Sequence, residues 1–275
     1  MTTFTLLQEH EKTFNCKKPI IGCLHMMPLP GTPYYDPNTM SIEKQINRLK
    51  KDAKTLSELG FDACVFANEG DRPYLTSVGP EIISTYVRIA TEVSKELTIP
   101  FGCGVLIDPK ATIAVANAIG AKFVRTYVSN TYAGSFGYQN FNPGDIFRYQ
   151  KQIGAENVKV YTYFEPHGGT CFDSRTTEEQ IAAGFELFPI AGMLVGGPRA
   201  GLPPEQAHFK KIKESYPDKP LILGSGSNKE NIKQLLPYAD GVIVGTTIKK
   251  DRYLYNEIDY NRAKEFIQSA KQAQK

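Results

Sequence analysis

Short apolar runs rich in Val, Ile, Phe and Tyr alternate along the chain with longer segments in which apolar positions recur every three or four residues. Such short runs are typical of buried strands, and the longer segments are typical of amphipathic helices. Because the two patterns alternate, the sequence predicts parallel β/α units. The predicted strands are Pro19–Leu24, Asp62–Phe66, Pro100–Leu106, Lys122–Val128, Val158–Phe164, Ile190–Val195, Pro220–Leu223 and Gly241–Val244, and the predicted helices are Ser41–Leu59, Pro80–Leu97, Pro109–Ile119, Pro143–Ile153, Thr176–Leu187, Pro203–Ser215, Asn228–Leu236 and Asp259–Ala273.

Eight strands, each followed by a helix, favour a closed barrel over an open doubly wound sheet, which has fewer strands and a switch point. Local signals agree, because Asp108 and Pro109 are typical of a helix cap and first turn. We therefore predict the α/β class and a single (β/α)8 TIM barrel over residues 1–275, without a linker or second domain. Residues 1–18 would be an N-terminal extension that packs under or beside the barrel through Phe4, Leu6, Leu7 and Phe14.

Composition narrows the class of protein. The 275 residues are 41% hydrophobic, which is enough for a substantial core. The 32 basic and 29 acidic side chains leave a formal charge of +3 without a run of like charges, so no nucleic-acid surface is indicated. The chain has no membrane-spanning apolar stretch, and its polar start lacks the order of a signal peptide. We expect a cytoplasmic protein that neither binds nucleic acid nor inserts into membranes.

Cysteine usage agrees with a reducing compartment. The five cysteines form no CxxC pair, and Cys23, Cys64 and Cys103 lie inside apolar runs, as small core residues do. Cys171 lies in the polar stretch GGTCFDSR, the one setting that resembles a reactive loop, and no prediction depends on it.

In a barrel of this type, the chemistry lies on loops at the C-terminal ends of the strands. Residues 25–40 and 129–142 are two long loops of this kind, rich in Gly, Pro, Tyr and Asn. They are predicted to form lids or subunit contacts. Because barrels with long tyrosine-rich loops often pair, we expect a homo-oligomer.

The strongest local signal is a pair of glycine-bearing corners after the last two predicted strands, which read GSGSN and GTT. Glycine lets backbone N–H groups turn inward, and a following helix N-terminus favours a dianion. The alternative is that these glycines only make tight β/α turns. Since both adjacent loops show the pattern, we predict a phosphate-bearing ligand. The predicted phosphate-binding residues are Gly224, Ser225, Gly226, Gly245, Thr246 and Thr247.

Ionisable side chains at the C-terminal ends of the other strands would converge on the same opening of the barrel, here called its mouth. The two glycine-bearing corners that would bind the phosphate are here called the phosphate grip. Carboxylates and imidazoles that face such a grip suit acid/base chemistry on a phosphorylated sugar or nucleoside. GSGSNK lacks the ending of a Walker loop, so nucleotide hydrolysis is not indicated. The predicted catalytic residues are His25, Asp71, Glu165 and His167, and the predicted substrate-binding residues are Asn68, Glu69, Asp108 and Arg125.

Several of these residues also have a structural interpretation. His25 could be a histidine satisfied by a backbone carbonyl. Glu69 and Asp71 share one turn, where one could act as a base while the other organises the loop, and Asp71 is the first choice for the base.

Arg125 and two further histidines complete the expectations. An inward Arg125 needs an anionic partner, and Asp108 or Glu165 could supply it, which would make Arg125 structural. His10 and His208 are expected at the surface.

Metal and lysine chemistry have no support in the sequence. Two histidines and several carboxylates could bind a divalent metal, but no HExxH or comparable spacing occurs, and we predict no metal and no other cofactor. A Schiff-base lysine is not indicated, because Ile190–Val195 contains no lysine and Lys159 lies early in its strand. Lys249 and Lys250 are expected in solvent or near the phosphate.

Three segments carry a resemblance to a known family: LHMMPLPGTP at 24–33, NEGDRPY at 68–74, and GSG at 224–226 with ADGVIVGTTIK at 239–249. Together they resemble the BtpA/SgcQ family over nearly the whole chain. The resemblance implies a TIM barrel of the ribulose-phosphate-binding type. It also implies a link to photosystem I biogenesis in cyanobacteria or to carbohydrate-utilisation gene clusters in other bacteria.

The chain departs from the family pattern at several polar positions. Ala67, Ile107, Thr162 and Pro166 replace polar or charged residues that the resemblance leads one to expect. Two hypotheses follow. One is an enzyme of lyase or isomerase type that acts on a phosphorylated small molecule. The other is a noncatalytic BtpA-like assembly or regulatory factor that retains a phosphate-ligand pocket.

Overall fold

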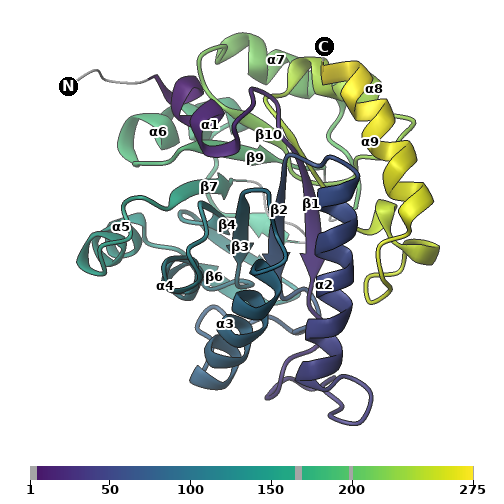
Figure 1. Cartoon of the computed structure of the whole chain (residues 1–275). Helices are drawn as coiled ribbons and strands as arrows, with labels where there is room; N and C mark the ends of the chain where they lie inside the picture. Colours follow the sequence, from purple (N-terminus) through teal and green to yellow (C-terminus); the bar gives the residue numbers. More distant parts are fainter. Residues whose placement is uncertain (1–4, 165–168, 198–200, 275) are drawn as a thin grey trace.

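The computed structural model describes residues 5–164, 169–197 and 201–274. Within these residues, eight parallel strands close into a barrel in the order β1-β11-β10-β9-β7-β4-β3-β2 (Figure 1), as predicted. The barrel strands are β1 (Ile20–His25), β2 (Ala63–Ala67), β3 (Phe101–Gly104), β4 (Phe123–Tyr127), β7 (Lys159–Tyr163), β9 (Gly192–Val195), β10 (Leu221–Leu223) and β11 (Val242–Val244).

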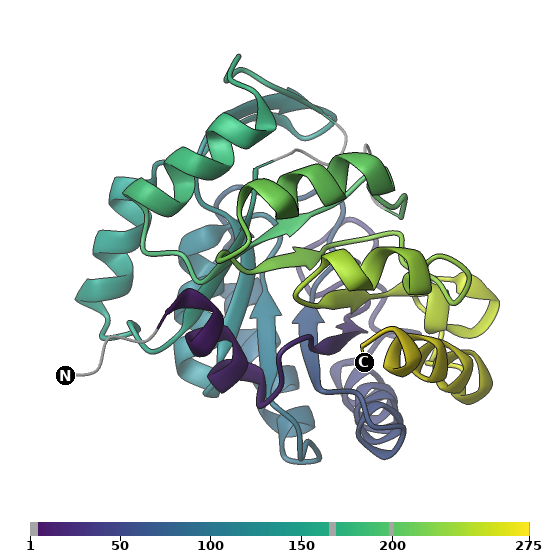
Figure 2. The ribbon, with the colours of Figure 1, turned by 90° about the horizontal axis from the view of Figure 1, so that it is seen from above.

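Helices surround the barrel (Figure 2), and their start and end signals are local. For example, the Asp108 side chain caps the fourth helix by accepting from the Ala111 amide, and Gly120 ends it with a φ of 73°. The helices after the first strand are α2 (Ile42–Glu58), α3 (Pro80–Ser94), α4 (Pro109–Ile119), α5 (Pro143–Gln152), α6 (Thr177–Leu187), α7 (Gln206–Ser215), α8 (Ile232–Leu235) and α9 (Tyr260–Gln274).

Helix α8 is shorter than the predicted helix Asn228–Leu236. Its first predicted residues form a turn instead, because the Asn228 carboxamide oxygen accepts from the amides of Glu230 and Asn231. Asparagine side chains compete in this way with helical hydrogen bonds. The turn leaves the backbone before α8 outside the helix.

The N-terminal extension forms helix α1 (Leu6–Phe14), which lies at the N-terminal end of the barrel (Figure 2). The Phe14 ring packs 4.9 Å from Phe123 and 5.7 Å from Tyr161 between ring centroids. His10 was expected at the surface, but only 1% of it is exposed. Its Nδ1 lies 2.9 Å from the Tyr161 hydroxyl and its Nε2 lies 2.8 Å from the Asp240 carbonyl oxygen. The amphipathic helix therefore turns His10 inward.

His10 should make the protein less stable in mild acid. A carbonyl oxygen only accepts, so Nε2 donates to Asp240, and neutral Nδ1 can accept from Tyr161. Burial lowers the pKa of His10. Below about pH 6.5 the unfolded chain therefore takes up a proton that the folded protein resists, and stability falls by up to about 1.4 kcal/mol per pH unit. In urea unfolding at pH 7.5 and 5.5, His10→Gln should lose less stability than the wild type, whereas equal losses would contradict this role.

A second, antiparallel sheet of order β6-β5-β8 was not predicted from the sequence. Its strands β5 (Thr131–Gly134), β6 (Gly137–Asn140) and β8 (Gly169–Cys171) come from loops that follow β4 and β7. Residues 131–140 form a β-hairpin, here called the mouth hairpin. These strands are short and largely exposed, so they lack the apolar run that marks the barrel strands.

Across the part of the chain that the structure describes, no helix has the length and apolar character that crossing a membrane requires.

Candidate functional site

A cavity of about 440 Å³ opens at the C-terminal ends of the barrel strands. Its walls come from β1, β4 and β7, from the loops after β2, β3, β10 and β11, and from the mouth hairpin. This is the end of the barrel on which the sequence places the chemistry. A cavity of this volume is within the range that holds small-molecule ligands.

Two loops that share this cavity offer free backbone amides. They are the β10 loop (residues 224–228) and the β11 loop (residues 245–247), and all of the predicted phosphate-binding residues line the cavity. The Thr247 hydroxyl donates to the Ser227 carbonyl oxygen at 2.9 Å, which ties the loops together. Among the described residues, no acceptor takes a hydrogen bond from the backbone amides of Ser225, Gly226, Ser227, Gly245, Thr246 and Thr247.

Ser227 is a cavity residue that was not among the predicted site residues. It is 2% exposed, and its hydroxyl has no hydrogen-bond partner among the described residues. A buried hydroxyl without a partner costs free energy unless a ligand or water satisfies it. Together with the free amides, it makes this wall suited to an oxyanion.

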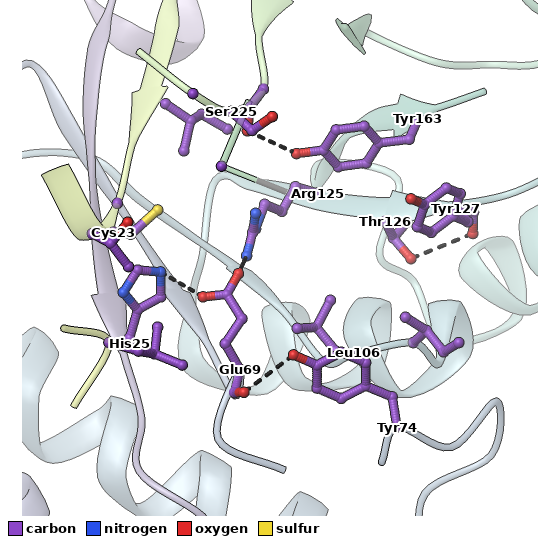
Figure 3. A pocket seen from close by; sticks show the side chains of 18 of the residues that line it. Cys23, His25, Glu69, Tyr74, Leu106, Arg125, Thr126, Tyr127, Tyr163 and Ser225 are labelled. Atoms are coloured by element: carbon purple, nitrogen blue, oxygen red, sulfur yellow. Dashed lines mark hydrogen bonds and ion pairs between the residues drawn. The ribbon is translucent and has the colours of Figure 1, made fainter. Parts of the chain in front are cut away.

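An ion-pair centre of three side chains, His25, Glu69 and Arg125, lies beside these loops (Figure 3). His25 ends β1, Glu69 follows β2, and Arg125 points inward from β4. One Glu69 carboxylate oxygen lies 2.5 Å from His25 Nε2, and the other accepts from the Arg125 guanidinium. Glu69 therefore joins the two groups that the sequence placed on separate strands.

The charge states in this centre follow from burial and pairing. Burial lowers the pKa of His25, and this effect exceeds the opposing effect of Glu69. Burial alone would raise the pKa of Glu69, but His25 and Arg125 together lower it well below the ordinary range. At neutral pH the centre thus holds a carboxylate, a guanidinium and a neutral imidazole. Its Nε2 faces the carboxylate, and its buried Nδ1 has no described hydrogen-bond partner.

Gly245 provides the space for the His25 ring. A Cβ atom built on Gly245 would lie 2.9 Å from His25 Cε1, which is closer than real Cβ contacts. The β11 loop and the ion-pair centre are therefore in direct contact, so the glycine at this corner has a packing role as well as a free amide.

Of the two partners predicted for Arg125, Asp108 was wrong. Asp108 does not reach Arg125, because its two carboxylate oxygens accept from the amides of Ala111 at 2.9 Å and Val78 at 3.0 Å. Asp108 lies outside the cavity lining and caps α4. The other predicted partner, Glu165, lies outside the described residues, and so does His167.

Asp71 and Asn68 lie behind the cavity wall and tie neighbouring loops together. The Asp71 carboxylate accepts from the Leu29 amide and from the Asn68 carboxamide, each at 2.8 Å. The Asn68 carboxamide oxygen accepts from the Leu106 amide at 2.7 Å. Burial raises the pKa of Asp71 to about 6. Within this turn it is Glu69 that faces the cavity, whereas Asp71, our first choice for the base, organises the loops.

Comparison with known proteins shows which family this chain belongs to. The sequence model of the BtpA family matches residues 16–272. The chain belongs to the BtpA family. It is 33% identical to the putative sgc region protein SgcQ of Escherichia coli, over 94% of this chain and 96% of that relative. It is 26% identical to the photosystem I biogenesis protein BtpA of Synechocystis, over 94% of this chain and 90% of that relative.

Solved structures similar to this BtpA family member share its fold. Phosphoribosyl anthranilate isomerase from Thermus thermophilus aligns with a TM-score of 0.58 at 12% identity, over 92% of this chain and 98% of the isomerase. Thiamine phosphate pyrophosphorylase from Pyrococcus furiosus aligns with a TM-score of 0.56 at 12% identity, over 94% of this chain and 98% of that enzyme.

Other cavity residues of this BtpA family member were missed because they resemble core or loop residues in sequence. In the sequence, Tyr163 looks like an ordinary apolar residue of a predicted strand, but in the structure its hydroxyl donates to the Gly224 carbonyl oxygen at 3.2 Å. Tyr74, Phe136 and Gln139 come from loops outside the predicted strands. Tyr163 lies two positions after Tyr161 on β7, so the period-2 alternation of a strand puts these two side chains on the same face, but no local pattern marks the loop residues.

Lys249 was expected in solvent or near the phosphate, but it is fully buried. Its ammonium donates to the Asn256 carbonyl oxygen at 2.8 Å and lies 3.7 Å from the Asp52 carboxylate. Burial lowers the pKa of Lys249 to about 8. In this BtpA family member, Lys249 anchors the segment after β11, whose Leu254 lines the cavity, while Lys250 is exposed as expected.

No group of three or more His, Cys, Asp or Glu side chains within the described ranges is arranged to hold a metal ion.

Proposed function

We propose that this BtpA family member is an enzyme that acts on a phosphorylated small molecule, a sugar phosphate or a nucleoside phosphate, by acid/base chemistry of the lyase or isomerase type. One observation carries the proposal: the free amides of two adjacent loops line the same cavity as an ionised Glu69 and a neutral His25. Together they offer a phosphate grip and a proton-transfer pair within reach of one small ligand.

The phosphate would bind to the amides of the β10 and β11 loops and to the Ser227 hydroxyl. Amides and a hydroxyl bind a dianion without requiring a metal ion. This anchor would fix the rest of the substrate over the ion-pair centre. The names of the two structural neighbours include phosphoribosyl anthranilate and thiamine phosphate, which agrees with a phosphorylated substrate.

Glu69 would be the base, Arg125 would stabilise the oxygen on which negative charge develops, and His25, whose one N–H faces Glu69, would orient that carboxylate. In the free protein Glu69 is a weak base, because both of its partners favour its ionised form. A substrate oxygen that pairs with Arg125 would release one Glu69 oxygen and raise its pKa towards the useful range. The base would then become active only when substrate is bound.

A noncatalytic role is the alternative. A relative of 26% identity is named for photosystem I biogenesis. The chain also has Ala67 where the family resemblance leads one to expect an acidic residue, and Pro166, which lies outside the described residues, where it leads one to expect a lysine. Under this alternative the cavity would bind a phosphorylated effector without converting it, and surface substitutions would affect function more than cavity substitutions.

Incubation with sugar phosphates and nucleoside phosphates in D₂O should distinguish the two. We expect at least one compound to gain carbon-bound deuterium in the presence of the wild type, detected by NMR, because a base that abstracts a carbon-bound proton returns solvent deuterium. Ligand at a hundred times its Kd should also raise the Tm by roughly 5–10 °C. Glu69→Gln should abolish the exchange but retain the Tm shift. A Tm shift without deuterium in any compound would favour the noncatalytic role, and no Tm shift with any phosphate would contradict the phosphate grip.

A further inference from the structure

The cavity wall formed by the mouth hairpin and the loop after β2 differs chemically from the phosphate loops. Its surface is aromatic and aliphatic, with Tyr74 and Phe136 in contact at 4.9 Å between ring centroids and 47° between ring planes. Leu106 and Ile107 from the loop after β3 extend this apolar surface. Simple sugar phosphates carry a hydroxyl on nearly every carbon and would leave this wall without a matching group.

Tyr74 is held in place by its hydroxyl, so its ring is a rigid part of the wall. The hydroxyl donates to the Glu69 carbonyl oxygen at 3.1 Å and accepts from Arg72 Nε at 3.3 Å. Figure 3 shows Tyr74 beside Leu106 and to the right of Glu69, with a dashed line from its hydroxyl to Glu69. The aromatic wall is thus adjacent to the ion-pair centre, on the side away from Ser225.

Gln139 from the mouth hairpin and Arg72 from the loop after β2 are polar side chains of this wall. The strand alternation of β6 exposes 78% of Tyr138 and turns Gln139 towards the cavity, where 9% of it is exposed. Its carboxamide makes no hydrogen bond with a described residue. Its nitrogen and oxygen are accessible from the cavity rather than fully buried, so the donor and the acceptor of the carboxamide are both available to a ligand.

We infer that Tyr74, Phe136 and Gln139 form a subsite for a flat nitrogen heterocycle of the nucleobase type, so that the phosphorylated ligand is a nucleotide rather than a simple sugar phosphate. The aromatic wall offers a stacking surface, which contributes about 1–3 kcal/mol per base in other proteins. A glutamine carboxamide pairs with an adjacent donor and acceptor on a base edge. The inference rests on the proposed function only for the binding of the phosphate group; the ring subsite is argued independently.

Calorimetric titration of the full chain tests the subsite. The ligands are the four common ribonucleoside 5′-monophosphates, the corresponding nucleosides and ribose 5-phosphate. We expect at least one monophosphate to bind at least tenfold more tightly than ribose 5-phosphate, since a good bidentate contact contributes about 1–3 kcal/mol and 1.4 kcal/mol is tenfold. Binding of every monophosphate within threefold of ribose 5-phosphate would overturn the inference.

Three variants test which residues cause the preference for a nucleotide over ribose 5-phosphate. Gln139→Leu and Phe136→Ala should each reduce the preference for the nucleotide about tenfold while leaving the Kd of ribose 5-phosphate unchanged. Tyr138→Ala, on the outward face of the same hairpin, is the matched control and should change neither Kd. If the two cavity variants keep the full preference, with thermal unfolding confirming that they are folded, the subsite is wrong.

The titrations test the phosphate grip and the ring subsite separately. Binding of nucleosides with no added affinity from the phosphate would contradict the phosphate grip and support the ring subsite. Tight binding of ribose 5-phosphate with no gain from any base would support the phosphate grip and contradict the ring subsite.

Discussion

Glu69→Leu should lower the free energy of unfolding by about 3 kcal/mol, because removing one partner of a buried ion pair leaves the other charge uncompensated, a loss of about 3–5 kcal/mol in other proteins. The lower end applies here, since 18% of the Glu69 side chain is exposed to the cavity. The substitution leaves the Arg125 guanidinium without its carboxylate and His25 Nε2 without its partner. Urea unfolding at pH 7.5 measures the loss.

A double variant shows whether the loss comes from the orphaned charge. Glu69→Leu combined with Arg125→Met removes both charges and should recover most of the stability lost in the single variant. If the double variant is as unstable as the sum of the two single variants, the pair contributes no coupling and this account is wrong.

A second substitution at the same position separates stability from chemistry. Glu69→Gln keeps the shape of the side chain and should leave phosphate binding within a few fold of the wild type, because the β10 and β11 loops are unchanged. Any turnover should fall at least a hundredfold, within the range ordinarily contributed by a general base. Retained turnover in Glu69→Gln would assign the base to another residue.

Gly226→Ala should weaken the binding of ribose 5-phosphate about a hundredfold. Gly226 has a φ of 74°, and a Cβ atom there would lie 2.0 Å from the Pro203 nitrogen and 2.1 Å from the Leu202 carbonyl carbon. The backbone of the β10 loop must therefore move, which turns its amides away from the ligand. Loss of two hydrogen bonds to a charged group, at about 1.5 kcal/mol each, gives roughly this factor.

Gly120→Ala is the matched control for backbone strain. Gly120 has a φ of 73°, lies at the end of α4, and has open space where its Cβ atom would be. Gly120→Ala should lose about 1–2 kcal/mol of stability from the left-handed backbone alone, and Gly226→Ala should lose more because of its clash with Leu202 and Pro203. Only Gly226→Ala should lose phosphate affinity. Equal affinity in the wild type and Gly226→Ala, measured by calorimetry, would show that the phosphate does not bind to this loop.

The outcome at Glu69 and Asp71 shows how far a local motif can be interpreted. Both carboxylates lie in one turn of the sequence NEGD, and both were candidates for acid/base chemistry. The sequence says that the turn is polar, but not which side chain faces the cavity. That choice depends on the amides of Leu29 and Leu106, which belong to loops after β1 and β3 and reach Asp71 and Asn68 only in the closed barrel.

His10 and Lys249 were misplaced for a related reason. Each is a polar residue, so the surface was the expected location. Each is buried because a distant residue satisfies it: the Asp240 carbonyl for His10 and the Asp52 carboxylate for Lys249. Burial of a polar group depends on partners, and partners far along the chain are not visible in local periodicity.

The sequence by itself determined the order of strands and helices, and with it the barrel, because periodicity, caps and turn glycines act over a few neighbouring residues. It also indicated the glycine corners of the β10 and β11 loops, since Gly224, Gly226 and Gly245 directly follow two strands of known order. The tertiary structure alone decided which charges meet. Glu69 and Arg125 are 56 positions apart, and His10 and Tyr161 are 151 positions apart. Only closure of the barrel brings such residues within hydrogen-bond distance, so the electrostatics of the site belong to the fold.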